Sequence, residues 1–589
     1  MPRRVAREKL PLNWLMPALF FLIGLVYIYG APNFEASDTV QHIGMIKFIA
    51  ETGTLPVQSG DHDELYGQEA SQPPLYYLIM AALWKAFDTS DFDERYLPSP
   101  FTVIGDPSGY GNRNLVIYKQ PYPPDLSGAS LALYAIRLLS LGMGAATVWA
   151  VMKSARVLMP GEAGIALLAG ALTAFNPQFI FISASVSNDT LVNILAALIT
   201  WRLLVMLRDG FDSRRSLVLA LLIALASLAK LSGLVLGAVV GLVALWMLVR
   251  RRDRRGFVVM AGALLVCWLF IAGWWYARNL TLYGELFGTS TMLDYFGRRS
   301  ITIGQLIAEE FQGLRVSYWA VFGAFNIVVH ELFYRLMDGL SVAGVLGLGV
   351  FVWRQRNSPR IITAIGFLAL LLALGAGALI AWSLDTWAST GRLLFPYITA
   401  ASLLLAQGLH TLRIPKLLII LPMLVFCLLA PFVYIIPNYD HPLAVDALPE
   451  SAERADVKWG DLRLTGYELP TQKLWRAGDE IPLTFYWRAE AQSPLAYALV
   501  LSLVDEAGDV ISRIETWPGW GTMPHPWMTL DTDYRDDYII EIPAAARATD
   551  ELALEIRWYV FPDGPGLDAV LESGLETEFF GLALGSLVG

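Results

Sequence analysis

The stretch IITAIGFLALLLALGAGALIAW, residues 361–382, contains no charged side chain. A bilayer core is about 30 Å thick, and a helix needs about 20 apolar residues to cross it. Lipid offers no hydrogen-bond partner to an open backbone, so only a helix or a closed barrel satisfies its own polar groups there. The stretch therefore predicts a transmembrane helix.

Similar apolar runs recur along the chain and predict a polytopic α-helical membrane protein with about eleven transmembrane helices. The other runs lie at residues 12–30, 131–152, 163–183, 190–207, 216–229, 232–249, 257–276, 339–353, 393–409 and 416–436. The first run follows a basic segment, residues 1–9, and no small-residue cleavage site comes after it. We therefore expect this run to be an uncleaved anchor.

The composition agrees with this prediction. Of the 589 residues, 55% are hydrophobic and 16% are charged, and the mean hydropathy is +0.49, which excludes an ordinary soluble enzyme. Cys267 and Cys427 each lie inside an apolar run, which excludes a disulfide framework and a CxxC metal site. The basic residues form no stripe suited to a phosphate backbone, so no nucleic-acid partner is expected.

The positions of the basic residues predict the orientation. With a cytoplasmic N-terminus, alternate loops carry the clusters at residues 153–156, 208–215, 250–255, 354–360 and 413–416, which is the positive-inside pattern. An odd number of spans then places the C-terminal region outside a cell (inner) membrane. On that outer side we expect three long segments, at residues 31–130, 277–338 and from 438 onward.

The C-terminal region predicts a separate all-β sandwich. Residues 440–589 contain 10 Lys and Arg against 27 Asp and Glu, and short alternating runs such as residues 481–487, 497–504 and 552–560 are separated by turns rich in Gly, Pro and Asp. We therefore predict a transmembrane domain at 1–437, with its large first outer loop, and an extracytoplasmic β-sandwich domain at 438–589. Most of its tryptophans are expected in the core, although exposed ones could stack on sugar rings.

The first outer loop holds the first candidate site. A helix is predicted after Ser37, its expected cap, and Asp38 and His42 fall on one face of that helix at positions i and i+4. A carboxylate beside an imidazole can accept a proton or bind a metal ion. The simpler interpretation is a helix cap and a histidine at headgroup level.

Two further polar segments lie at predicted outer ends of helices. Gln72 precedes Pro-Pro-Leu-Tyr76-Tyr, where the prolines suit the first turn of a helix. Asp189 follows Asn188 where one span ends and the next begins, and a helix cap is the simpler interpretation there too.

Three cations, Lys230, Arg278 and Arg392, also lie at predicted outer ends, where the positive-inside rule disfavours them. One such residue could extend its charge to the interface. Three cations together with Asp38 and Asp189 at one membrane level instead indicate a pocket for an anionic headgroup.

These motifs, in this order, resemble the GT-C superfamily of polytopic glycosyltransferases, in particular its branch of protein mannosyltransferases and lipid A aminoarabinose transferases. The family motif Asp-Glu-x-x-His is matched by residues 38–42 except that Thr39 replaces Glu. The family segments His/Gln-Pro-Pro-Leu-Tyr-Tyr and Pro-x-Phe with a later Asn-Asp-x-Leu are matched by residues 72–77 and 177–191. Residues 273–284, 317–323 and 391–396 resemble further signatures of bacterial relatives, so that the likeness extends over residues 10–436.

The resemblance implies transfer of a sugar from a polyprenyl-phosphate donor to a glycan, lipid or protein outside the membrane. Asp38, His42 and Asp189 would be catalytic, Asp38 as the base or, with His42, as ligand of a divalent metal ion. Lys230, Arg278 and Arg392 would bind the donor phosphate, and Glu35, Glu69, Gln72 and Tyr76 would position the acceptor. For the missing Glu, either Asp38 suffices, or Glu35 or Glu69 takes its place, or the chain has lost the activity.

Two other function classes remain open. A transporter or flippase of anionic lipid-linked substrates would use the same cations, but transporters usually carry repeats and midplane charges. Here Arg202 is the main charge inside a span and the carboxylates cluster in outer loops, which favours an enzyme. An envelope-assembly protein that its helices merely anchor would need only one span.

Overall fold

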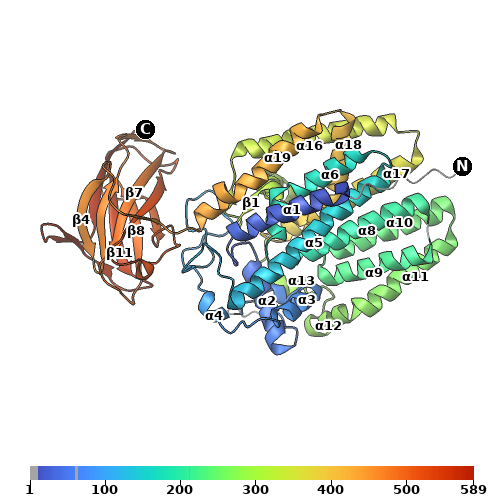
Figure 1. Ribbon diagram of the computed structural model, residues 1–589, viewed down its shortest axis with the longest axis horizontal. Helices are drawn as coiled ribbons and strands as arrows, with labels where there is room; N and C mark the ends of the chain where they lie inside the picture. Colours follow the sequence, from blue (N-terminus) through green and yellow to red (C-terminus); the bar gives the residue numbers. More distant parts are fainter. Residues whose placement is uncertain (1–10, 60–63, 211, 589) are drawn as a thin grey trace. The chain divides into compact units, whose positions relative to one another are not determined.

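The computed structural model describes residues 11–59, 64–210 and 212–588, so the basic segment 1–9 lies outside the described residues. The chain forms two compact units (Figure 1). Unit 1 comprises Met1–Phe92 and Leu126–Ile435, and unit 2 comprises Asp93–Asp125 and Ile436–Gly589.

Unit 1 is helical, and all eleven predicted apolar runs fall on helices. Its principal helices are α1 (Pro11–Gly30), α2 (Thr39–Thr52), α3 (Leu75–Trp84), α5 (Gly128–Leu158), α6 (Ala163–Ala174), α7 (Pro177–Ser183), α8 (Asp189–Asp209), α9 (Ser213–Ala229), α10 (Gly233–Arg251), α11 (Arg254–Ile271), α12 (Gly273–Tyr283), α13 (Thr289–Phe296), α15 (Phe311–Trp319), α16 (Glu331–Arg354), α17 (Pro359–Asp385), α18 (Ile398–Thr411) and α19 (Lys416–Ala430). In the described part of the chain, eight helices are long and apolar enough to cross a membrane, and nine if α6 and α7 form one span. The protein is a polytopic helical membrane protein, as predicted, with fewer clear spans than eleven.

The predicted span at residues 163–183 is bent instead of straight. α6 and α7 meet at an angle of 63°. Pro177 has no N–H to continue the helix from α6, and its ring displaces the preceding turn. Asn176 caps the new helix, because its side-chain oxygen accepts a hydrogen bond of 3.0 Å from the Phe179 N–H. After the bend, α7 ends at Ser183, and a short turn leads to Asp189 at the start of α8.

Glycines let α16 and α18 pack at close range. A Cβ at Gly408 would lie 1.8 Å from the Gly344 carbonyl oxygen, and one at Gly347 would lie 2.1 Å from the Gly408 oxygen. Small residues are the usual means of close helix contact in lipid, where van der Waals packing replaces the hydrophobic effect. This contact holds α18, whose N-terminal end continues from the segment with Arg392.

We predict that Gly408→Ala lowers the thermal unfolding midpoint of the purified protein, because the added methyl forces two backbones apart at a cost of about 1–3 kcal/mol. Gly349→Ala on α16 is the matched control, since a Cβ there meets nothing within 4 Å. Equal midpoints for the two variants would contradict the close packing of α16 on α18.

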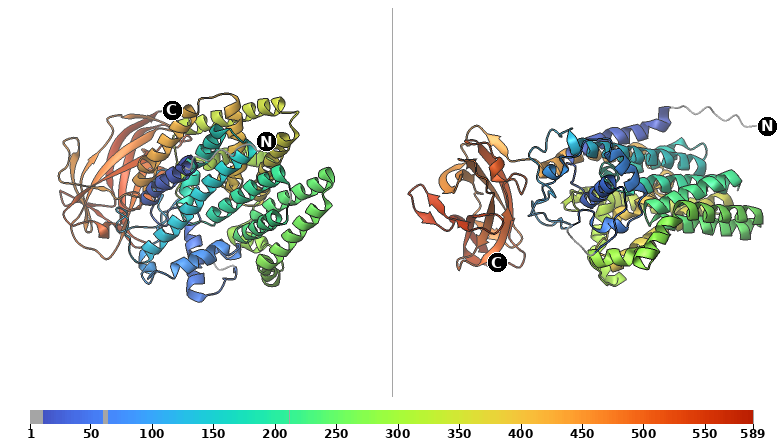
Figure 2. Two further views of the ribbon diagram at one scale, coloured as in Figure 1. Left: turned by 45° about the vertical axis from the view of Figure 1, so that its right-hand side comes forward. Right: turned by 90° about the horizontal axis from the view of Figure 1, so that it is seen from below.

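Unit 2 contains two β-sheets (Figure 2). The seven-stranded sheet has the order β14-β13-β4-β5-β7-β10-β3, and the other has the order β6-β15-β11-β8-β9 with β12 beside β11. The strands are β3 (Leu443–Val445), β4 (Glu453–Trp459), β5 (Leu462–Glu468), β6 (Leu474–Arg476), β7 (Glu480–Ala489), β8 (Tyr497–Val504), β9 (Val510–Thr516), β10 (Asp533–Glu541), β11 (Thr549–Val560), β12 (Gly566–Leu567), β13 (Ala569–Leu571), β14 (Glu576–Thr577) and β15 (Phe580–Val588). The three alternating runs of the sequence lie in β7, β8 and β11.

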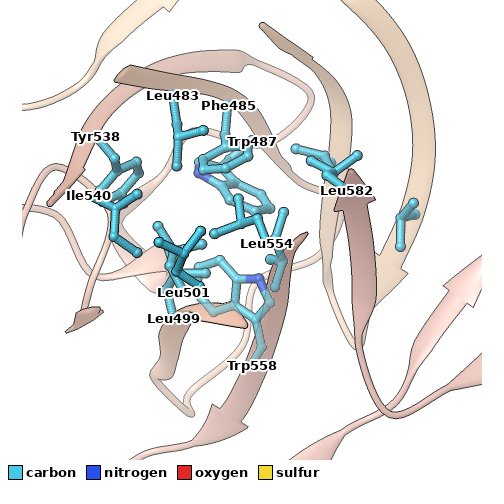
Figure 3. Close-up of a cluster of buried hydrophobic side chains, with 14 of the residues drawn as sticks. Leu483, Phe485, Trp487, Leu499, Leu501, Tyr538, Ile540, Leu554, Trp558 and Leu582 are labelled. Carbon is cyan, nitrogen blue, oxygen red and sulfur yellow. The ribbon is translucent and has the colours of Figure 1, made fainter. Parts of the chain in front are cut away.

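Apolar side chains of both sheets form the core of unit 2. Trp487 on β7 lies edge-on to Trp558 on β11, with ring centroids 5.1 Å apart, and leucines of β8 and β11 fill the surrounding space (Figure 3). Trp475 and Trp517 are buried as well. These tryptophans therefore belong to the core and form no exposed platform for sugar rings.

The segment Asp93–Asp125 belongs to unit 2, although we expected the whole loop 31–130 in the transmembrane domain. Asn112 donates a hydrogen bond of 2.9 Å to the Glu515 carbonyl, and Asn114 one of 3.0 Å to the Gly521 carbonyl. Ile117 is buried against Ala498 and Trp517. The loop thus pairs two side-chain amides with backbone carbonyls of the β unit and buries Ile117 on it, a pairing that sequence position gave no reason to expect.

Unit 2 also buries a carboxyl group. Asp536 on β10 accepts hydrogen bonds from the Tyr538 hydroxyl at 2.6 Å and from the Gly519 N–H at 3.0 Å. Burial raises the pKa of Asp536 to about 7. In the unfolded chain the carboxyl has its ordinary pKa near 4, so between about pH 4 and pH 7 the folded unit retains a proton that the unfolded chain releases.

We therefore predict that this group makes unit 2 less stable as the pH rises from 4 to 7. Asp536→Asn keeps the shape of the neutral acid, so its thermal midpoint should equal that of the wild type near pH 3, below both pKa values, and exceed it near pH 8. The measurement is thermal unfolding of both full-length proteins at each pH. A difference that stays constant with pH would show that Asp536 is ionised throughout.

Candidate active site

Asp38 stands at the beginning of α2 in an unusual backbone conformation. Its φ of 61° is left-handed, and although it occupies the N-cap position, where we expected Ser37, its side chain makes no capping hydrogen bond. Such conformations in a residue other than glycine cost energy and often mark functional sites. The carboxylate instead forms an ion pair with Arg392, with the Arg392 Nη2 donating to Asp38 Oδ2.

Arg392 is held in place by the short helix η3 (Gly391–Tyr397). The Gly391 N–H donates to Ser317 Oγ at 2.7 Å, and a Cβ at Gly391 would lie 2.2 Å from the Leu314 carbonyl oxygen, so only glycine fits there. The guanidinium lies over the Phe325 ring at 4.8 Å. Its Nε and Nη1 atoms are buried and have no hydrogen-bond partner among the described residues.

Asp189 and Lys230 form a second ion pair. Asp189 is the first residue of α8, Lys230 follows the last residue of α9, and the Lys230 Nζ lies 2.5 Å from Asp189 Oδ1. Asp189 is buried and also lies within electrostatic reach of Arg392 and His42. The two ion pairs therefore belong to one site.

His42, Tyr77 and Glu69 form a buried hydrogen-bonded group beside these pairs. The His42 Nδ1 lies 2.9 Å from the Tyr77 hydroxyl, which donates to Glu69 Oε2 at 2.5 Å, and the His42 Nδ1 lies 3.3 Å from the same Glu69 oxygen. Asn188 donates to the Tyr77 oxygen at 3.2 Å. Glu69 therefore contacts His42. It is one of the two carboxylates, with Glu35, that could replace the Glu missing from the family motif.

A close approach of backbones brings Glu69 to His42. A Cβ at Gly44 on α2 would lie 2.5 Å from the Leu65 carbonyl carbon, which leaves room only for glycine. The chain then enters the short helix η1 (Gly67–Ser71), which carries Glu69. Glu69 lies 27 positions after His42 in the sequence, and this spacing did not indicate that Glu69, and not Glu35, contacts His42.

Tyr76 and Gln72 lie on the same side of unit 1 but make different contacts. The Tyr76 hydroxyl lies 3.1 Å from Ser140 Oγ and accepts a hydrogen bond of 3.1 Å from the Ser187 N–H. It thereby fixes the turn that precedes Asp189. The Gln72 side chain donates to the Met292 sulfur at 3.6 Å, away from both carboxylates.

Two other predicted residues make their contacts elsewhere. Glu35 is buried in the wall of a small cavity that Arg137 also lines. The Arg278 Nη2 donates to the carbonyl oxygens of Leu55 and Pro56, at 3.3 and 2.7 Å. Of the five charged residues expected to converge, the structure joins Asp38, Asp189, Lys230 and Arg392, whereas the contacts of Arg278 in the described chain anchor the loop after α2.

The donor set does not fit a metal ion. Asp38 is paired with Arg392, and the His42 Nδ1 is engaged with Tyr77 and Glu69. Throughout residues 11–59, 64–210 and 212–588, no three His, Cys, Asp or Glu side chains gather so as to hold a metal ion.

Comparison with known proteins gives a likeness in fold only. No family model matches the chain, and no curated protein matches it. Among solved structures it is similar to ArnT from Cupriavidus metallidurans bound to undecaprenyl phosphate (15% identity, TM-score 0.42, 71% of this chain and 64% of that one). It is also similar to the Archaeoglobus fulgidus oligosaccharyltransferase (13%, 0.40, 72% and 52%) and to the mycobacterial arabinofuranosyltransferase AftD (14%, 0.41, 75% and 29%).

The chain spans less than two thirds of the length of each of these proteins.

Sequence reasoning did not assign a role to Tyr77, Asn188 or Ser317. Tyr77 and Asn188 stand directly beside Tyr76 and Asp189 in the motifs, so adjacency was the available signal. Ser317 opens the segment at residues 317–323, but nothing in the sequence relates it to Gly391. Its role depends on the packing of α15 against η3.

We predict that Asp189 and Lys230 are energetically coupled. Removing either partner leaves a charge that is poorly hydrated, so Asp189→Asn and Lys230→Gln each lower the thermal midpoint, and the double variant loses less than the sum of both. A coupling of about 1–3 kcal/mol is expected. The exposed pair Arg298 and Asp294 is the control, because its coupling should stay below about 1 kcal/mol. Additive losses at Asp189 and Lys230 would contradict a functional ion pair.

Proposed function

We propose that this protein is a membrane glycosyltransferase that moves a sugar from a polyprenyl-phosphate donor to a hydroxyl group of a glycan, lipid or protein. The donor class follows from the resemblance of the sequence motifs, and the chemistry follows from the site of unit 1. The reaction would take place at the helix ends that the positive-inside pattern assigns to the outer face of the inner membrane.

The observation that carries the proposal is the state of the Arg392 guanidinium. One nitrogen is engaged with Asp38, while Nε and Nη1 are buried donors without a partner in the described chain. A buried unpaired donor costs about 1–3 kcal/mol, so a ligand oxygen there would be favourable. Each of these two nitrogens can donate a charge-assisted hydrogen bond to a phosphate oxygen.

Asp38 is suited to accept the proton of the acceptor hydroxyl. Its side chain is 34% exposed, whereas that of Arg392 is 7% exposed, so the carboxylate is open to an acceptor while the guanidinium is buried. In the proposed step the acceptor oxygen attacks the anomeric carbon from the side opposite the phosphate. Its proton passes to Asp38, and the bond between the anomeric carbon and the phosphate oxygen breaks with inversion.

The leaving group explains the cations. As the bond breaks, polyprenyl phosphate gains negative charge, and positive groups already in place stabilise the transition state more than the ground state. Arg392 binds the phosphate directly in this proposal. Lys230, fixed by Asp189, supplies a second charge, and Arg278 holds the loop after α2 through carbonyl contacts.

The group of His42, Tyr77 and Glu69 lies one helical turn from Asp38 and is suited to orient the acceptor. Burial and the neighbouring Glu69 carboxylate raise the pKa of Tyr77 well above its usual range, so its hydroxyl stays protonated. A neutral hydroxyl between an imidazole and a carboxylate gives a fixed direction to the hydrogen bonds of the site.

The test measures transfer from a radiolabelled polyprenyl-phosphate sugar by the purified full-length protein in liposomes. Asp38→Asn is expected to lower turnover by a factor of about 10²–10⁴, the usual contribution of a general base. Asp294→Asn, an exposed carboxylate of the same unit, is the control and should keep wild-type turnover. Unchanged turnover of Asp38→Asn would remove Asp38 from the mechanism.

The same liposomes separate the proposal from the two other function classes. A transporter would move the labelled lipid between leaflets without releasing sugar or forming a product. An envelope-assembly protein would do neither. Product formation that depends on Asp38 and Arg392 agrees only with a transferase.

A further inference from the structure

A groove lies in unit 1 at the helix ends remote from the candidate active site. It has a volume of about 540 Å³ and is bordered by the turn from α5 to α6, the end of α16 and the turn from α18 to α19. α18 runs from the segment with Arg392 to this groove over 14 residues, about 20 Å of helix. The volume is in the usual range for small-ligand sites.

The groove carries an excess of positive charge. Arg354, Arg413 and Lys416 line it, against the single carboxylate of Glu162. Glu162 faces His410, with 3.7 Å between its Oε2 and the His410 Nε2. Within the described residues, no carboxylate forms an ion pair with any of the three cations.

This arrangement is the reverse of that at the active site. There each cation is already paired with a carboxylate, whereas here the cations face an open hollow. Three cations beside one carboxylate leave a net positive charge in the groove, so an anion that enters the hollow is stabilised.

A buried amide in the same wall lacks a partner. Gln407 is 2% exposed, its Nε2 donates to Thr411 Oγ1 at 3.3 Å, and its Oε1 has no hydrogen-bond partner among the described residues. An unpaired buried acceptor is unfavourable. A ligand hydroxyl that donates to this oxygen would satisfy it.

The remaining wall is apolar. Phe351 and Ile165 are buried beside the cations, and Leu412, Leu417 and Leu418 are exposed next to the groove on the flanking helices. An apolar surround beside a basic hollow at the ends of transmembrane helices matches a lipid whose headgroup enters while its chains stay in the bilayer.

We propose that this groove binds a phosphate-bearing headgroup that also carries a hydroxyl group. Arg354, Arg413 and Lys416 bind the phosphate, and Gln407 accepts the hydroxyl hydrogen bond. The site is separate from the proposed transfer reaction, because its residues lie one helix length from Asp38. On the predicted topology it faces the cytoplasmic leaflet.

The experiment measures binding of fluorescent phosphatidylglycerol to the full-length protein in detergent. The wild type should bind it saturably, and Arg413→Gln/Lys416→Gln should weaken binding about tenfold or more, since each cation near a membrane surface contributes about 1 kcal/mol. Arg356→Gln/Arg360→Gln removes two charges of the same loop region that do not line the groove, and it should bind as the wild type does.

Two further measurements identify the source of the phosphate group and test the hydrogen bond between the ligand hydroxyl and Gln407. Competition by millimolar inorganic phosphate would indicate a soluble phosphate as the ligand, and its failure would indicate the lipid headgroup; both results agree with a phosphate site. Gln407→Leu should weaken binding of phosphatidylglycerol more than that of phosphatidic acid, which has no headgroup hydroxyl. Equal binding by the wild type and by Arg413→Gln/Lys416→Gln, with equal thermal midpoints, would overturn the proposal.

Discussion

Two ion pairs at the helix ends, Asp38 with Arg392 and Asp189 with Lys230, are the interactions on which the organisation of unit 1 depends. They join positions separated by 354 and 41 residues. A buried charge is tolerated only where its partner is in place, so the segments that carry these four residues must be positioned together. The bend at Pro177 and the close approach at Gly391 are the local features that make this possible.

Unit 1 uses cations in two ways. At the candidate active site each cation is held by a carboxylate, which keeps it in a fixed position while Arg392 retains two donors for a ligand. In the remote groove the cations line an open hollow. Fixed positions suit a transition state, in which charge develops at one atom, whereas an open hollow suits a bound headgroup that undergoes no reaction. Arg392 of the active site lies in η3, directly before α18, and Gln407 and His410 of the groove lie on α18 itself.

Much of this could be predicted from the sequence because the signals were local. The apolar runs predict the helices by length alone, and alternation predicts β7, β8 and β11. The spacing of Asp38 and His42 predicts one face of a helix, but Asp38 lies before α2 as its left-handed N-cap, and only His42 lies on the helix. Position at a helix end, however, did not show that Arg278 has different partners from Lys230 and Arg392. Composition likewise did not show which of Glu35 and Glu69 contacts His42. The partner of each residue depends on the course of the loops, which hydrophobic periodicity does not predict.

The sequence by itself determined that the chain is a multi-helix membrane protein with a C-terminal β region, since hydrocarbon thickness and backbone hydrogen bonding leave few alternatives for such apolar runs. It also determined which residue types are available for a phosphate site. Tertiary structure alone decided that Glu69 meets His42, that the segment Asp93–Asp125 packs on the β unit, and that Arg392 keeps two unpaired donors. These depend on contacts between residues far apart in the chain, where the free energy of burying a group is set by whatever partner the fold brings to it.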